Sequence, residues 1–306
     1  MSVFRNLLIA RASHQPDPEP VETDYIELRI VDTTPGPYHF KIATLDYLDG
    51  ILEYSTDLST WNRVTNTNLI PFPSSGSVYL RGMGNTKARG SFSEPFIEVF
   101  NRRKFEIHGL ITKLLDYQNP VTTLSASCFA YIFQESGATT PIRLPDTITE
   151  IGESCFSGAH KKNYYLTKPM NIPKLLTTLP PFSFNNVHGS NYNLVEAFEL
   201  PEGLTSIQSN ALSSAFSRCN RLEYPLIFPS GLRVIDLQGV SYAHLENTYL
   251  YMYSSPREGY TTRWQIPVGC HLGKDATKFM FEDTGTDWPN TPQTYTIAYT
   301  KDRPTS

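Results

Sequence analysis

The chain has 306 residues, of which 40% are hydrophobic, 12% aromatic and 18% charged, and its formal net charge is −4. The aromatic content excludes an intrinsically disordered chain, and the 23 prolines exclude a helical bundle or coiled coil. The small negative charge gives no general attraction to nucleic acid, and no apolar run reaches the roughly 20 residues needed for membrane insertion. The length predicts about two domains, and the composition favours strands and turns.

Residues 1–21 predict an N-terminal tail and a proline-rich linker. The tail contains one short apolar cluster, formed by Phe4, Leu7, Leu8 and Ile9, and the linker at residues 13–20 is polar and rich in proline. A secretory signal needs a longer apolar region followed by a small-residue cleavage site. Two alternatives remain: the cluster anchors the protein on a neighbouring subunit, or the terminus is disordered.

Residues 22–108 predict an immunoglobulin-like β-sandwich. Short segments alternate apolar and polar residues, which is the period-two pattern of a half-buried strand, and turn residues separate them. The expected strands are residues 25–31, 38–42, 51–54, 61–64, 78–81 and 96–100.

Two motifs in this region are similar to catalytic or nucleotide-binding motifs. The segment Ser55-Thr-Asp57-Leu-Ser-Thr-Trp61 resembles the Asp-box hairpin of sialidases, but it occurs once and lacks the usual central glycine. We interpret it as a tight hairpin in which Asp57 binds local backbone and Trp61 packs. Gly82-Met-Gly84 lacks the third glycine of a nucleotide-binding loop, and it predicts a turn.

From residue 109 onward the chain repeats a unit of 27–28 residues. An apolar residue followed by proline begins most units, at Leu144-Pro145, Ile172-Pro173, Leu200-Pro201 and Phe228-Pro229. Seven residues after each lead position stand Ile151, Leu179, Ile207 and Ile235, and Leu124 holds the matching place in an earlier unit. One unit cannot bury its apolar face alone, so the units are expected to stack as coils, each with a short strand and a turn or helical segment.

The predicted fold class is therefore mainly β: an N-terminal β-sandwich followed by a solenoid with a C-terminal cap at residues 109–306. The sandwich is expected to close one end of the stack through Phe105, Ile107, Leu110 and Ile111. At the other end the repeat is interrupted after Phe228 and resumes at Ile266-Pro267. An alternating segment at residues 295–299 is expected to form a last strand that covers the final coil.

The repeats resemble the BspA-like, or type 5, leucine-rich repeat. The segments that carry the resemblance are Leu144-Pro-Asp-Thr-Ile-Thr-Glu-Ile-Gly-Glu-Ser-Cys-Phe156 and Leu200-Pro-Glu-Gly-Leu-Thr-Ser-Ile-Gln-Ser-Asn-Ala-Leu212. The preceding region is similar to a β-domain found before such repeats in proteins of gut Bacteroidales and their phages. Residues 1–8 are similar to the start of many virion proteins of those phages. The resemblance implies an adhesin or a structural component, and no enzyme.

Candidate catalytic and metal-binding residues favour structural roles. His160, His188 and His244 share one register with Phe216, which indicates packing positions and no metal site. The repeat carboxylates occupy polar positions and form no pair suited to glycoside hydrolysis, so no catalytic residue is assigned. The four cysteines show no Cys-x-x-Cys spacing and are expected to be free and buried, and no cofactor is expected.

Two segments are candidates for binding. The interruption of the repeat contains Tyr249, Tyr251, Tyr253, Arg257 and Tyr260, which form either a contact surface or a strand that buries alternate tyrosines. A second contact candidate is the run Lys161-Lys162-Asn163-Tyr164-Tyr165.

The expected function is that of a non-enzymatic component of a phage virion, in the tail, a fibre or the capsid-associated proteins. Its expected partners are other virion proteins, further copies of itself, and a glycan or protein of the host surface. The alternative is a bacterial cell-surface adhesin with the same repeats, although the opening of the chain does not predict a signal peptide. A carbohydrate-active enzyme is a third hypothesis, which the missing carboxylate pair disfavours.

Overall fold

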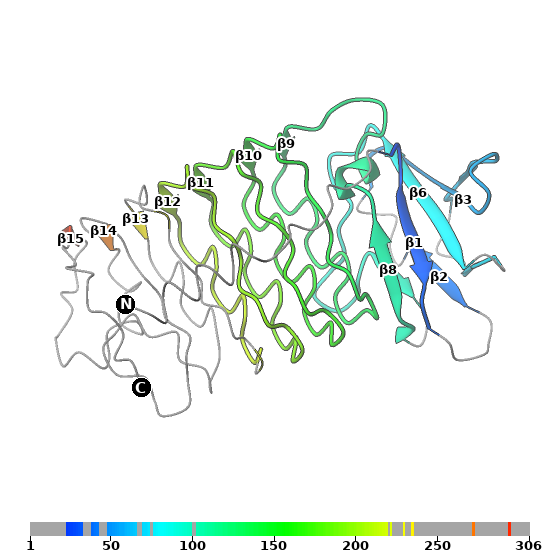
Figure 1. Cartoon of the computed structure of the whole chain (residues 1–306). Helices are drawn as coiled ribbons and strands as arrows, with labels where there is room; N and C mark the ends of the chain where they lie inside the picture. Colours follow the sequence, from blue (N-terminus) through cyan, green and yellow to red (C-terminus); the bar gives the residue numbers. More distant parts are fainter. Residues whose placement is uncertain are drawn as a thin grey trace.

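The computed structural model describes residues 23–32, 38–42, 48–65, 69–73, 76–99, 102–219, 221 and 229, and the backbone of three short strands beyond them. Strands and turns dominate this part of the chain, and helix is almost absent. Figure 1 shows the N-terminal strands at one end of the molecule, with successive coils following one another along its length. None of the helical segments among these residues has the length and apolar character of a membrane span.

The N-terminal region forms two antiparallel sheets. One has the strand order β4-β3-β6-β1-β8 and the other β5-β2-β7. Their bounds are β1 Ile26–Ile30, β2 His39–Ile42, β3 Ile51–Ser55, β4 Asn62–Arg63, β5 Ile70–Pro71, β6 Ser77–Met83, β7 Ile97–Val99 and β8 Phe105–His108. Each of the six expected strands has a counterpart here, whereas β5 and β8 were not among the expected strands.

Alternation of apolar and polar residues positions these strands. Ile26 and Leu28 in β1, and Phe40 and Ile42 in β2, are fully buried, while the residues between them are partly exposed. Successive side chains of a strand point to opposite faces, so each strand presents one apolar face. The inward-facing residues of both sheets belong to a single buried cluster that continues into the coils.

The turn expected at Gly82-Met-Gly84 is wrong for its first two residues, which complete β6. A side chain at Gly82 would collide with the carbonyl oxygen of Leu114, in the short 3-10 helix η2 (Ile111–Leu114). Glycine is thus required by the close approach of η2 to the strand. Only Gly84 bends the chain, with a φ of +68°.

Short parallel strands stack along one edge of the repeat region (Figure 1). They are β9 Thr123–Leu124, β10 Glu150–Ile151, β11 Thr178–Leu179, β12 Ser206–Ile207 and β13 Val234–Ile235. Leu124 pairs with Ile151, Leu179 with Ile207, and Ile207 with Ile235. These strands belong to two sheets, one with β9 and β10 and one that begins with β11, β12 and β13. Within each sheet the residues at the seventh position of the repeat face one another, which confirms the predicted register for these pairs. We call residues 123–219 the repeat stack.

The rest of each coil includes a ribbon of consecutive turns. In this ribbon one backbone N–H bonds within its own coil and the next bonds to the neighbouring coil. For example, Ala130 N–H donates to the Ser127 carbonyl at 3.3 Å, whereas Phe129 N–H donates to the Cys155 carbonyl at 2.8 Å. A positive φ recurs every fourth residue, at Ser127, Tyr131 and Glu135, at Ser154, Gly158 and Lys162, at Phe182, Asn186 and Ser190, and at Asn210, Ser214 and Arg218. The segment expected to be a turn or helix thus consists of turns.

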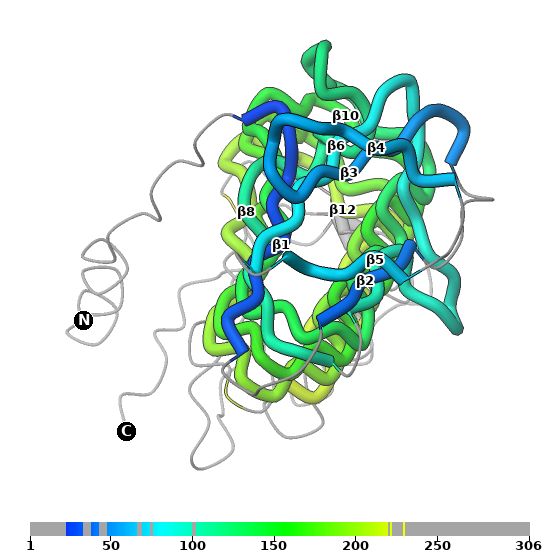
Figure 2. Tube along the Cα trace, turned by 90° about the vertical axis from the view of Figure 1, so that its right-hand side faces the viewer, coloured from blue at the N-terminus to red at the C-terminus, as the bar shows by residue number. Residues whose placement is uncertain are grey.

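The N-terminal region closes the first coil through its backbone. Phe105 forms a parallel bridge with Ala138, and Leu110 forms one with Arg143, at the positions where capping was predicted. The connection between β6 and β7 also runs along the turn ribbon, since Gly90 N–H donates to the Ala130 carbonyl at 2.8 Å. Figure 2 views this end, with the N-terminal strands in front of the coils.

At the far end β14 (His271–Leu272) pairs in parallel with β13, and β15 (Gln293–Thr294) pairs antiparallel with β14. The parallel order of the coils therefore resumes after the interruption and is then reversed. The strand expected at residues 295–299 lies outside the described residues.

Candidate binding surface

The histidines of the repeat are packing residues. The ring of His160 stacks on Phe133 at 5.9 Å and on His188 at 5.6 Å, and His188 stacks on Phe216 at 6.1 Å. Both imidazoles are fully buried. The predicted packing role is confirmed for these two residues, whereas His244 lies outside the described residues.

Their hydrogen bonds hold both imidazoles neutral. The backbone N–H of Ile142 donates to Nε2 of His160 at 3.1 Å, and that of Met170 donates to Nε2 of His188 at 3.2 Å. Protonation would place two donors against each other. Burial also lowers the pKa of His160 to about 3 and that of His188 well below its ordinary value. Among the described residues no group of three His, Cys, Asp or Glu side chains could hold a metal ion.

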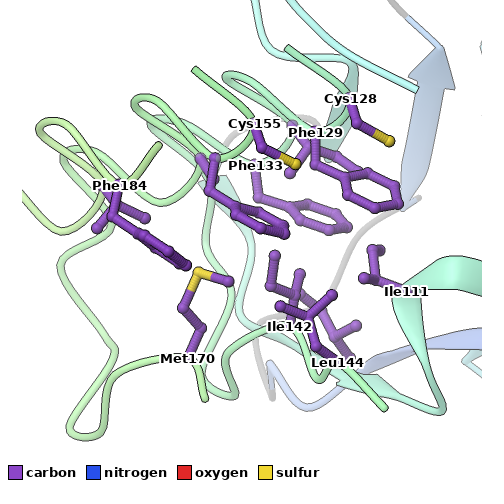
Figure 3. Packing of buried hydrophobic residues seen from close by; sticks show 14 of the residues in the cluster. Ile111, Cys128, Phe129, Phe133, Ile142, Leu144, Cys155, Met170 and Phe184 are labelled. Atoms are coloured by element: carbon purple, nitrogen blue, oxygen red, sulfur yellow. The ribbon is translucent and has the colours of Figure 1, made fainter. Parts of the chain in front are cut away.

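The described cysteines are buried thiols, as predicted. Cys128 and Cys155 lie on neighbouring coils beside the stacked phenylalanines (Figure 3), and Cys219 is equally buried. Burial raises the pKa of Cys128 well above its usual value and that of Cys219 to about 12. Reactive cysteines need an accessible thiolate, and the buried thiols of Cys128 and Cys219 remain protonated. Cys270 lies outside the described residues.

The Asp-box-like segment is a structural hairpin. The Asp57 carboxylate accepts hydrogen bonds from the backbone N–H groups of Ser59 at 2.8 Å and Thr60 at 2.9 Å. These bonds lower the pKa of Asp57 to about 2. Trp61 packs against the guanidinium of Arg81, whose central carbon lies 3.9 Å from the ring centroid. The interpretation as a tight hairpin is confirmed.

A group of cationic and aromatic side chains gathers where the turn ribbon ends beside the N-terminal sheets. It includes four residues from the second contact candidate of the sequence, and the fold adds six more. We call it the cation–aromatic surface; its members are Phe92, Arg102, Lys104, Tyr131, Glu135, Lys161, Lys162, Tyr164, Tyr165 and Tyr192.

An ion-pair column runs along this surface. Glu135 lies between Arg102 and Lys162, with distances of 2.8 Å and 2.6 Å between the charged atoms. All three residues have a positive φ, between 49° and 57°, so Arg102 extends the outward-facing column of the ribbon into the N-terminal region. The Lys162 ammonium, and after it Arg102, keep the pKa of Glu135 below its usual value. Burial and the neighbouring Lys162 lower the pKa of Lys161.

Tyrosines form a second column beside the first. The rings of Tyr164 and Tyr192 stack at 5.5 Å with an interplanar angle of 3°, because they occupy equivalent positions in successive coils. The guanidinium carbon of Arg102 lies 6.0 Å from the Tyr164 centroid, and the ammonium of Lys104 lies 4.8 Å from the Tyr165 centroid. Tyr165 and Tyr192 remain 38% and 40% exposed, so the column is accessible to a partner.

Phe92 is 73% exposed, yet its backbone and its ring both have partners. The buried amide of Gln134 donates to the carbonyls of Ser91 and Phe92 at 3.0 Å and 3.1 Å. The Lys161 ammonium lies 4.5 Å from the ring centroid, and the Tyr131 ring meets it at 6.2 Å and 81°. The sequence contained no signal for this site, because residues 92, 131 and 161 come together only through the stacking of coils.

Other predicted site residues fall elsewhere. Both predicted sets of contact residues lie outside the described residues. They are the binding candidates Tyr249, Tyr251, Tyr253, Arg257 and Tyr260 and the anchor candidates Phe4, Leu7, Leu8 and Ile9. The carboxylates considered for glycoside hydrolysis are all partly or fully exposed: Asp146, Glu150, Glu153, Glu199 and Glu202.

Comparison with known proteins bears on the repeats. Residues 116–252 match the family model of the BspA type leucine rich repeat region, in 6 copies. No curated protein and no solved structure matches the chain. Repeats of this kind mediate protein–protein or surface binding, and their coils coincide with the paired strands described above. The match supports the assignment of this region to the BspA-like leucine-rich-repeat family.

Proposed function

We propose that the protein is a non-enzymatic structural and binding component of a phage virion, in the tail, a fibre or the capsid-associated proteins. In this proposal a leucine-rich-repeat solenoid makes contact with other virion proteins, with further copies of the chain, or with the host surface. A β-sandwich closes one end and a C-terminal cap the other. The observation that carries the binding role is the match of residues 116–252 to BspA type repeats.

The placement in a virion is supported by the resemblance of residues 1–8 to the start of virion proteins of phages of gut Bacteroidales. The N-terminal β-region resembles a domain found before such repeats in proteins of these bacteria and of their phages. The non-enzymatic role is supported by the groups that resemble catalytic residues. His160 and His188 are buried and neutral, and Asp57 is used by its own hairpin.

Mass spectrometry of purified phage particles tests the placement. We expect peptides of this protein at a fixed ratio to the major capsid protein after gradient purification. Absence from particles, together with recovery in the envelope fraction of the bacterium, would favour the alternative, a bacterial cell-surface adhesin. The match of residues 116–252 to these repeats supports that alternative equally, because both roles are binding roles.

A second assay tests the absence of catalysis. The purified protein is incubated with capsular and cell-wall polysaccharide of the host bacterium, and reducing ends are measured. We expect no release above a heat-denatured control. Release that co-purifies with the protein would overturn the non-enzymatic assignment.

A further inference from the structure

We propose that the cation–aromatic surface binds an acidic polysaccharide, a chain of pyranose units that bear carboxylates. This inference rests on the proposed binding function and names the chemical class of partner for this surface. Three features of the surface lead to it: its charge, its exposed ring and its regular spacing along the stack.

The surface is cationic although the whole chain is not. Arg102 and Lys162 share the carboxylate of Glu135, while Lys104 and Lys161 lie against aromatic rings. Within the described residues no carboxylate lies within ion-pair distance of Lys104 or Lys161. The surface thus holds four cationic side chains and one carboxylate, a formal charge of +3, whereas the chain as a whole carries −4. Such a patch attracts a carboxylate-bearing partner, because ammonium groups form charge-assisted hydrogen bonds with carboxylates.

The aromatic side chains offer the contacts that a sugar ring uses. The exposed ring of Phe92 presents a flat apolar surface to the C–H face of a pyranose. Tyr164 and Tyr192 each cover one face of the other, so along this contact they present ring edges and hydroxyl groups, which can bind sugar hydroxyls. The 5.5 Å between these rings is comparable to the length of one pyranose unit, so a glycan lying along the stack meets equivalent groups in successive coils.

These same features disfavour other anionic partners. Single-stranded nucleic acid binds through bases that stack on open aromatic faces in a positively charged groove. Here Tyr164 and Tyr192 each cover one face of the other, and the Arg102 guanidinium lies over Tyr164, so few open tyrosine faces remain for bases. An acidic peptide supplies carboxylates but lacks the repeated hydroxyls and the flat C–H faces that Phe92 and the tyrosine edges fit.

Calorimetric titration of the full chain with an oligogalacturonate tests the inference. The matched ligand is the fully methyl-esterified oligomer, which keeps every pyranose ring and loses every charge. We expect binding to the free acid that weakens as salt rises, and binding to the ester that is several-fold weaker. An oligothymidylate and a poly-glutamate of similar charge are titrated in parallel and should bind less tightly than the galacturonate.

Two variants with matched controls locate the binding to this surface. Lys161→Gln and Phe92→Ser should each weaken galacturonate binding several-fold. The controls are Lys174→Gln, which removes an exposed lysine paired with Asp146, and Leu175→Ser, which removes an apolar side chain that is 56% exposed. Both controls should bind as the native chain does, and thermal unfolding verifies that every variant is folded.

The inference is overturned by any of four results: no binding of the galacturonate, equal binding of its ester, tighter binding of the nucleic acid or peptide, or equal losses in variants and controls. Particle composition is measured separately, so the two proposals fail independently. A protein that is present in particles but does not bind the glycan retains its proposed function and loses this partner.

Discussion

The N-terminal sheets and the repeat stack connect their backbones in opposite ways. In the N-terminal region β1 pairs with β6 and β8, so that Glu27 faces both Tyr79 and His108, far away in the chain. In the repeat stack each coil bonds to the next at an offset of one repeat, as between Leu179 and Ile207. The first arrangement requires distant segments to assemble together, whereas the second is built from neighbouring units.

The two regions also differ in what joins their parts. At the junction of the N-terminal sheets with the first coil, single side-chain contacts add to the backbone bridges. The Arg81 guanidinium lies between the rings of Trp61 and Tyr117, at 3.9 Å and 4.3 Å from their centroids. The repeat stack instead repeats one contact many times, as in the column of Phe129, Phe156 and Phe184. Stability is therefore concentrated in a few joints in one region and distributed over equivalent positions in the other.

The largest effect is expected in the phenylalanine column. Phe156 is fully buried between Phe129 at 5.8 Å and Phe184 at 5.1 Å. Phe156→Ala should lower the free energy of unfolding by about 3–5 kcal/mol, because it leaves a cavity between coils. The matched control is Phe182→Ala, since Phe182 is 39% exposed, and it should cost no more than about 0.5 kcal/mol. Equal losses in chemical denaturation would contradict the assigned register.

The buried histidines should make the repeat stack sensitive to acid. The pKa of His160 falls from 6.5 in the unfolded chain to about 3 in the folded one, so only the unfolded state takes up a proton in between. The free energy of unfolding is therefore unaffected by His160 above about pH 6.5 and decreases as the pH is lowered. At pH 5 the loss from His160 is about 2 kcal/mol. His188, whose pKa is also lowered, adds a loss of the same sign.

Denaturation curves at pH 7 and pH 5 measure this loss. In the double variant His160→Phe and His188→Phe, both positions carry the residue type of their stacking partners Phe133 and Phe216. The difference in the free energy of unfolding between pH 7 and pH 5 should then shrink. The variant should be less stable at pH 7, since the N–H groups of Ile142 and Met170 lose their acceptors. An unchanged acid loss in the double variant would show that other groups cause it.

A smaller effect is expected at the joint between the two regions. The Asn85 side chain accepts from Gly50 N–H at 2.8 Å and donates to the carbonyls of Ile51 at 2.7 Å and Leu114 at 3.0 Å. Asn85→Ala should lower the free energy of unfolding by about 2 kcal/mol, because it leaves buried backbone groups without partners. Asn62→Ala, at an exposed position of β4, should have almost no effect. If the two variants unfold alike, Asn85 is not a joint.

The smallest effect is expected at the polar surface of the coils. Glu202 is exposed and follows Leu200-Pro201, where a repeat begins. Glu202→Ala should change the free energy of unfolding by no more than about 0.5 kcal/mol. A loss comparable to that of Phe156→Ala would mean that the polar positions of the repeat also carry its stability.

The register of the repeat stack could be predicted from the sequence. Leu179 and Ile207 were assigned to equivalent inward positions, and they pair across neighbouring coils. The reason is physical: each coil packs against equivalent neighbouring coils, so the same positions must be buried in every repeat. Apolar residues therefore recur at a fixed spacing in the sequence. The packing role of His160 and His188 could be predicted for the same reason, since Phe216 occupies their register.

The turn ribbon could not be predicted, because local preference does not specify it. Tyr131, Glu135 and Lys162 adopt a positive φ, which their residue types do not favour. That conformation is maintained by hydrogen bonds to the neighbouring coil, as between Glu135 N–H and the Lys161 carbonyl at 2.8 Å. Such bonds exist only after the coils have stacked.

The cation–aromatic surface could likewise be predicted only in part from the sequence. The sequence by itself determined that Lys161, Lys162, Tyr164 and Tyr165 follow one another at the end of a coil, and hence that one coil could make a contact there. Only the tertiary structure placed Phe92 against Lys161. The stack requires its first coil to be covered, and the connection between β6 and β7 meets that need by bonding along the turn ribbon. Contacts between coils follow from a repeated local pattern, whereas contacts at the junction depend on how two unlike regions pack.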